Sequence, residues 1–111
     1  MDLRGWILLQ EGYHVINCSN GFEAIRRAVT GRVHVVVIDL DRNAVEMTVI
    51  AREIKRRRPS VPTIVLTERS GREHRSAELC RMADLLVPKE HGPEALVEGV
   101  EKALDQKATA A

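Results

Sequence analysis

Apolar positions along this chain follow two patterns, one with helical spacing and one with short continuous runs. Met47, Ile50, Ala51 and Ile54 show the i, i+3, i+4, i+7 spacing that puts apolar side chains on one face of a helix. This kind of spacing, together with capping and breaking residues, predicts five helices, of which the fourth has the weakest periodicity. We expect the helices at residues 3–10, 21–30, 45–58, 71–82 and 93–104.

Four short runs rich in β-branched residues separate these helices, at residues 13–19, 33–40, 62–67 and 84–89. The run VHVVVIDL at 33–40 shows no polar alternation, which is typical of a parallel strand covered by helices on both faces. We expect it to be the most buried element. Strands that alternate with helices predict a parallel sheet between two helical layers. The expected fold class is therefore α/β, a three-layer sandwich with four strands and five helices.

Length, charge and cysteine content narrow the class of protein. The 111 residues fit one domain, which we place at residues 1–106, with a disordered tail at 107–111. Seventeen basic residues nearly balance 16 acidic ones, and no apolar run approaches the roughly 20 residues of a membrane span. Cys18 and Cys80 form neither a disulfide framework nor a zinc site. We expect a cytoplasmic protein that binds neither membranes nor nucleic acid.

The basic run KRRR at 55–58 could suggest a nucleic-acid site. It closes a predicted helix, however, where the helix dipole favours cations, and no aromatic residues interleave with it. We therefore interpret it as a solvated helix end.

Three predicted strands end on residues with distinctive chemistry, namely Asp39, Thr67 and Lys89. In a parallel α/β sheet the functional crevice lies at the carboxyl ends of the strands, where these side chains would meet. A carboxylate can attack a phosphoryl group, while a hydroxyl and an ammonium can bind the phosphate oxygens. The alternative is structural: Lys89 forms a salt bridge with Asp39, and Thr67 only ends a strand.

Four motifs carry a family resemblance, in order and spacing: EGYHVINCSNGFEAI, VVVIDL, VPTIVLT and ADLLVPKEHGPEAL. Over roughly residues 3–105 the chain resembles the receiver domain of bacterial two-component response regulators, the CheY-like family. The resemblance implies a flavodoxin-like (βα)5 fold. It also implies that Asp39 corresponds to the aspartate phosphorylated by a histidine kinase, Thr67 to the switch hydroxyl and Lys89 to the phosphate-sensing lysine.

The chain departs from the family pattern where the resemblance requires Mg²⁺. The first strand, which ends on the metal-binding acids, has no counterpart, and Asp2 is the only acid before Glu11. Asp41 is a weak candidate for a second oxygen ligand. Three further departures flank the site: Asn43 replaces a common proline, Leu86 replaces an aromatic residue, and Pro88 precedes the lysine instead of following it.

From these departures we expect a pseudo-receiver. This is a stand-alone signalling protein, not an enzyme, that acts through protein contacts, has no cofactor, and has lost or impaired phosphorylation at Asp39. The alternative is a functional phosphoacceptor that uses Mg²⁺, with the missing acids supplied by Asp41 or by a partner. A sensor kinase or another signalling protein would be a partner in either case.

The missing strand is central in the family's sheet, and each buried backbone group left without a partner costs about 1–3 kcal/mol. The remaining strands could close up into four, or a second molecule could cover the gap. Closing up would leave an apolar face of the first helix exposed, and we expect this face to form a homodimer interface. Trp6 could instead be an ordinary core residue. The candidate interface residues are Leu3, Trp6, Ile7 and Leu9.

Overall fold

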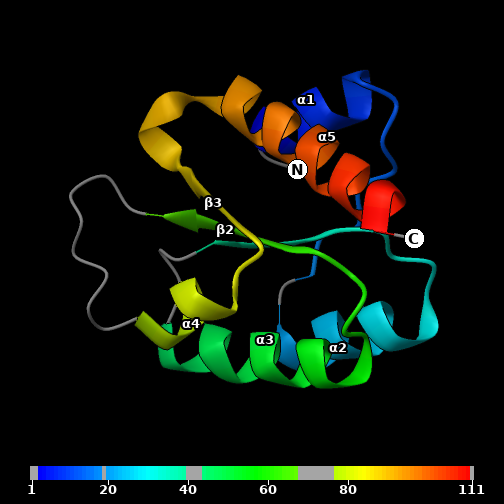
Figure 1. Cartoon of the computed structure of the whole chain (residues 1–111), viewed down its shortest axis with the longest axis vertical. Coiled ribbons are helices and arrows are strands. Elements are labelled where there is room, and N and C mark those ends of the chain that lie inside the picture. The colour runs from blue at the N-terminus through cyan, green and yellow to red at the C-terminus, as the bar shows by residue number, and fades with distance from the viewer. Residues whose placement is uncertain (1–2, 19, 40–43, 68–76, 111) are drawn as a thin grey trace.

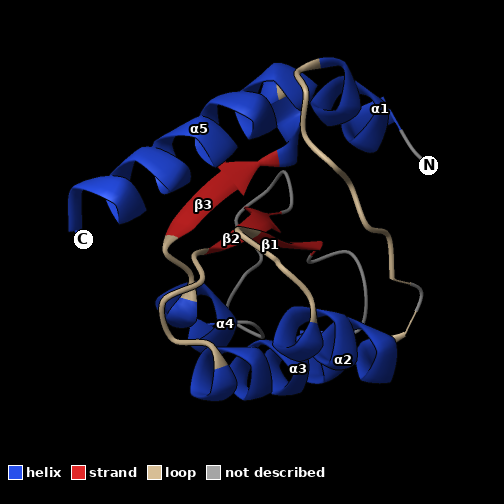
Figure 2. Cartoon of the chain, turned by 90° about the vertical axis from the view of Figure 1, so that its right-hand side faces the viewer, coloured by secondary structure: helices blue, strands red, loops and turns tan. Residues whose placement is uncertain are grey.

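A computed structural model describes residues 3–18, 20–39, 44–67 and 77–110. These residues form a parallel sheet between two helical layers (Figures 1 and 2). The sheet consists of β1 (Val36–Asp39), β2 (Thr63–Thr67) and β3 (Leu85–Pro88), in the order β1-β2-β3. One layer holds α1 (Leu3–Gln10) and α5 (Pro93–Ala110), and the other holds α2 (Gly21–Thr30), α3 (Ala44–Arg57) and α4 (Ala77–Met82). A short 3-10 helix, η2 (Lys89–His91), joins β3 to α5.

The expected α/β class with five helices is confirmed, and α1 and α2 have the predicted bounds. α3 is shifted by one residue from the prediction. α4 begins at Ala77, and the earlier part of the predicted fourth helix, 71–76, lies outside the described residues. α5 extends to Ala110 and so includes residues 107–110 of the tail that we expected to be disordered, while residue 111 lies outside the described residues.

β2 is the most buried strand, because all five of its residues are buried between the two helical layers. The expectation that 33–40 would be the most buried element was wrong. In β1 only Ile38 is buried, and Val37 remains 38% exposed. The reason is position: within the described residues β1 pairs with β2 alone and lies at the edge of the sheet.

The prediction of a fourth strand at 13–19 was also wrong for the residues described. Tyr13–Cys18 forms neither a strand nor a helix, and Ser19 lies outside the described residues. The segment has the β-branched composition of a strand, but composition alone does not make one, since a strand needs a neighbour to accept its hydrogen bonds. Among the described residues the sheet therefore has three strands, not the four that closing up would give.

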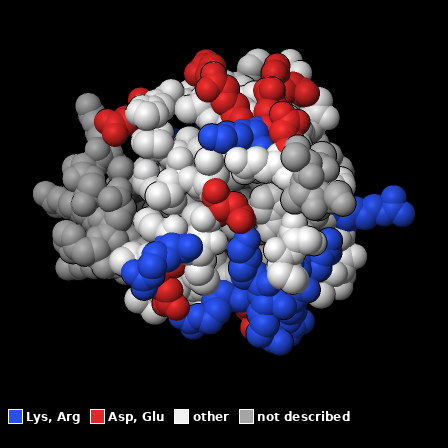
Figure 3. Space-filling model, in the orientation of Figure 1, with Lys and Arg blue, Asp and Glu red and all other residues white. Residues whose placement is uncertain are grey.

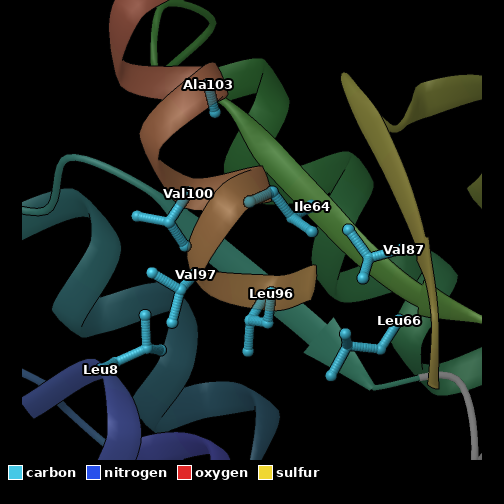
Figure 4. Packing of buried hydrophobic residues seen from close by; sticks show 8 residues of the cluster. All are labelled: Leu8, Ile64, Leu66, Val87, Leu96, Val97, Val100 and Ala103. Atoms are coloured by element: carbon cyan, nitrogen blue, oxygen red, sulfur yellow. The ribbon is translucent and has the colours of Figure 1, made fainter. Parts of the chain in front are cut away.

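Side chains of alternate residues point to opposite faces of the sheet and build two cores. Ile64 and Leu66 of β2 face α1 and α5, where they pack with apolar side chains of those helices (Figure 4). Val65 points to the other face, where it packs with Ile38, Ala51 and Leu79. The first cluster consists of Leu8, Ile64, Leu66, Val87, Leu96, Val97, Val100 and Ala103.

Local signals in the sequence account for the layer of α2 and α3. The Asn20 side chain caps α2 by accepting a hydrogen bond from the backbone N–H of Glu23 at 2.8 Å. The predicted inner face of α3 is confirmed, with Ile50, Ala51 and Ile54 buried. Gly21 lets the two helices approach closely, because a Cβ at this position would lie 2.5 Å from Cδ1 of Ile50.

Candidate functional site

The three residues predicted to share a site lie at the same edge of the sheet. Asp39 ends β1, Thr67 ends β2, and Lys89 directly follows β3. Because the strands are parallel, their carboxyl ends meet at this edge. The Lys89 Nζ forms an ion pair with Oδ1 of Asp39. Since β2 lies between β1 and β3, the lysine side chain reaches across the end of the central strand.

Burial differs between the members of this site. The side chain of Lys89 is 14% exposed and that of Asp39 is 40% exposed, while Thr67 is buried. The lysine stem therefore packs against protein, and its charged end meets the carboxylate near the surface. In this arrangement Lys89 neutralises Asp39 and would also be placed to hold a negative group attached to it.

The described side chains do not fit a magnesium site. Mg²⁺ prefers several oxygen ligands in octahedral geometry. The described ranges contain no group of three or more carboxylate, imidazole or thiol side chains that could hold a metal ion, and the Asp39 carboxylate is already bound by Lys89. Asp41, the candidate second ligand, lies outside the described residues, as does Asn43.

Leu86 lies in β3 beside Val65 of β2 and is exposed. An exposed aliphatic side chain at this position has no polar atom that could form a hydrogen bond with a group at the site. It therefore differs from the aromatic residue that the family resemblance implies there.

Two polar contacts that were not predicted from the sequence brace the opposite end of the sheet. The Asp84 Oδ2 accepts hydrogen bonds from the backbone N–H of Thr63 at 2.7 Å and from Nζ of Lys55 at 2.5 Å. Asp84 thus joins the start of β3 to β2 and α3. The available signal was an acid directly before an apolar strand, where a carboxylate can accept hydrogen bonds from backbone N–H groups of the neighbouring strand.

Basic side chains at the end of α3 form ion pairs and hydrogen bonds within the chain. Arg56 and Arg57 pair with Glu53, and these hydrogen bonds lower the pKa of Glu53 to about 2. Arg58 donates to the backbone oxygens of Ala28 at 3.0 Å and Gly31 at 3.5 Å, which ties α3 to the end of α2. Figure 3 shows basic side chains gathered over the α2–α3 layer and acidic ones over α5.

The candidate interface residues of α1 divide into two groups. Leu3, Trp6 and Leu9 are 62%, 53% and 45% exposed, whereas Ile7 is half-buried against the core between α1 and α5. The alternative that Trp6 is a core residue is therefore wrong. Ile7 belongs to the core, and three residues remain as candidates for an interface.

A parallel sheet between two helical layers, with an aspartate, a hydroxyl and a lysine at its carboxyl edge, is the arrangement that the resemblance to receiver domains implies. A family model described as "Response regulator receiver domain" matches residues 1–101, and the chain belongs to this family. The chain is similar in structure to a CheY-like receiver domain protein from Methanospirillum hungatei, with a TM-score of 0.82 and 22% identity over 97% of this chain and 86% of that one. It is also similar to the receiver domain of NtrX from Brucella abortus, with a TM-score of 0.79 and 22% identity over 94% of this chain and 88% of that one.

Among curated proteins, the chain is 27% identical over 110 residues to the transcriptional regulatory protein GlrR of Escherichia coli. The match covers 99% of this chain but spans 25% of that relative's length. Because the relative is named a transcriptional regulator, our expectation that nucleic acid is not a partner stays a prediction. Within the described residues, none of the helices combines the length and apolar composition of a membrane span.

Proposed function

We propose that this chain is an atypical receiver that signals through protein contacts, with phosphorylation of Asp39 lost or strongly impaired. Receiver domains are signalling modules that interact with kinases and other signalling proteins. The observation that supports impairment is the donor set at the carboxyl edge. There the described side chains include no acidic cluster that could hold the divalent ion needed for phosphoryl transfer.

The direct test is incubation of the protein with Mg²⁺ and acetyl phosphate, followed by mass spectrometry of the intact chain and of its peptides. We expect little or no phosphoryl adduct on Asp39. The Asp39→Asn variant is the matched control for labelling elsewhere. Near-stoichiometric labelling of Asp39 that is lost in the variant would overturn the proposal.

The second candidate function is a working phosphoacceptor, favoured by the ion pair between Lys89 and Asp39 and by the position of Thr67 at the same edge. It requires Mg²⁺ bound at Asp39 with help from Asp41 or a partner. Magnesium titration followed by nuclear magnetic resonance separates the two functions. Saturable binding in the native protein that disappears in both Asp39→Asn and Asp41→Asn would favour the phosphoacceptor.

We further propose that the protein forms a homodimer through α1. This helix exposes Leu3, Trp6 and Leu9, and its one charged residue is Arg4. Burial of an aromatic and two aliphatic side chains against a second copy would remove this apolar surface from water. Analytical ultracentrifugation at micromolar concentration tests the dimer, with Trp6→Ser as the disrupting variant. A monomer in the native protein would refute it.

A further inference from the structure

The α2–α3 layer carries three arginine side chains that have no partner among the described residues. Arg26 and Arg27 lie on α2, Arg32 follows the cap residue Gly31, and all three are exposed. No ion pair or side-chain hydrogen bond joins any of the three to another described residue. We refer to Arg26, Arg27 and Arg32 as the arginine surface.

The end of α3 extends the positive charge of the arginine surface. Arg58 donates to two backbone oxygens at the end of α2, so the C-terminal ends of α2 and α3 lie side by side. Arg56 and Arg57 share a single carboxylate, that of Glu53, which leaves this end of α3 positive. The positive charge therefore continues across the ends of both helices (Figure 3).

A row of glutamates without partners lies on α5, in the other helical layer. Glu94, Glu98 and Glu101 are spaced i, i+4, i+7, which places them along one side of the helix over about 10 Å. All three are exposed, and none forms an ion pair or a side-chain hydrogen bond with a described residue. Lys102 is the one basic residue between positions 94 and 105, so the row stays negative. We call these three glutamates the acidic stripe.

The arginine surface and the acidic stripe cannot meet within one molecule. Figure 2 shows α5 in one helical layer and α2 and α3 in the other, with the sheet between them. The molecule measures 33 × 30 × 28 Å, whereas exposed charges more than about 8 Å apart are largely screened from each other at physiological salt. Because the two surfaces lie on opposite layers, one layer of a copy can lie against the other layer of the next copy.

We propose that the arginine surface binds the acidic stripe of a second copy of this chain. Three unpaired cations and three unpaired carboxylates are complementary in sign and number, and their pairing would neutralise both surfaces. Duplex DNA fits less well, because a chain with a formal net charge of +1 has no overall field to attract it and the acidic stripe would repel it. Since the two surfaces differ, each copy can bind two others, and the contact builds open chains. This contact is separate from the α1 surface and does not depend on phosphorylation.

Salt dependence separates this contact from the apolar one proposed at α1. Exposed ion pairs are individually weak, so we expect the association only at low salt and at protein concentrations of about 0.1 mM or higher. Sedimentation velocity of the full chain in about 20 mM and about 300 mM sodium chloride measures it, and we expect association at least about tenfold weaker at the higher salt. Dimers that form through the apolar side chains of α1 should persist in both, so the mass at the higher salt is the baseline.

Charge reversal tests which side chains form the contact. One variant reverses the arginine surface through Arg26→Glu, Arg27→Glu and Arg32→Glu. A second variant reverses the acidic stripe through Glu94→Lys, Glu98→Lys and Glu101→Lys. We expect each variant alone to lose the salt-dependent association, because like charges then face each other, and an equimolar mixture of the two to regain it.

A chain with all six reversals keeps the native formal net charge of +1, and we expect it to associate as the native chain does. This variant separates pairing of the two surfaces from an effect of net charge. Arg81→Glu, an exposed change on α4, is the control for a charge reversal elsewhere, and it should change the association by less than about twofold. Circular dichroism checks that each variant folds, and the equimolar mixture tests the pairing if the chain with six reversals does not.

Three results would overturn the inference: no association of the native chain that weakens with salt, unchanged association in either folded variant with three reversals, or no recovery in their mixture. A native chain that stays at one mass in low salt but binds duplex DNA would assign the arginine surface to nucleic acid and would also overturn it. Phosphorylation of Asp39 would refute the proposed function without affecting any of these measurements.

Discussion

The ion pair between Asp39 and Lys89 allows a quantitative test of the site, because its two members differ in burial. Asp39→Asn leaves an ammonium that is 14% exposed facing a neutral amide, so most of the lysine's desolvation is no longer offset by the carboxylate. Lys89→Met keeps the packed stem and leaves a carboxylate that is 40% exposed and can be solvated. We expect losses in the free energy of unfolding of about 2 kcal/mol for Asp39→Asn and about 0.5–1 kcal/mol for Lys89→Met.

Urea denaturation followed by circular dichroism measures both losses, and the double variant closes a thermodynamic cycle that gives the coupling between the two side chains. Glu98→Gln, an exposed change on α5, is the control and should stay within about 0.5 kcal/mol of the native protein. The reasoning fails if Lys89→Met costs as much as Asp39→Asn. It also fails if the cycle gives a coupling near zero.

Three further predictions concern helices around the sheet. Leu79→Ala should cost about 3 kcal/mol in urea denaturation, because Leu79 is fully buried against the sheet; a loss below 1 kcal/mol would contradict this packing. Asn20→Ala should cost about 1 kcal/mol by removing the cap on the Glu23 N–H, while Asn20→Asp should retain most of that stability. Hydrogen bonds from Arg56 and Arg57 lower the pKa of Glu53 from 4.5 to about 2. The stabilisation of the folded state by these bonds should therefore be complete above pH 4.5 and disappear as the pH falls toward 2. Thermal melting across this range should therefore show a shallower pH dependence in Glu53→Gln than in the native protein, and an unchanged dependence would refute the assignment.

The elements that could be predicted from the sequence are those determined by local pattern. Asn20 marks the start of α2, and the spacing of Ile50, Ala51 and Ile54 gave the inner face of α3 correctly. The position of Asp39 and Lys89 at one edge follows from the parallel order of the strands, which an alternation of helices and strands already indicates. These features need no knowledge of distant parts of the chain.

The features that could not be predicted depend on which strands find neighbours. Tyr13–Cys18 has a strand-like composition but no partner, and the apolar run around Val37 looks central although β1 lies at an edge. A local pattern of residues indicates which environment suits a segment. It does not determine which strands pair, because pairing depends on the rest of the sheet. For the same reason the contacts of Asp84 with Thr63 and Lys55 could not be identified before the strands were placed.

The all-parallel sheet also determines the order in which the molecule can assemble. Two parallel strands cannot form a hairpin, so each pair must wait for the helix between them to dock. The first such unit along the chain is β1–α3–β2, and it is complete only when the chain has been synthesised as far as Thr67. Such non-local pairing slows folding. Refolding kinetics should therefore be more sensitive to mutations in α3 than to mutations in α1, which packs against α5, a helix that follows all three described strands in the chain.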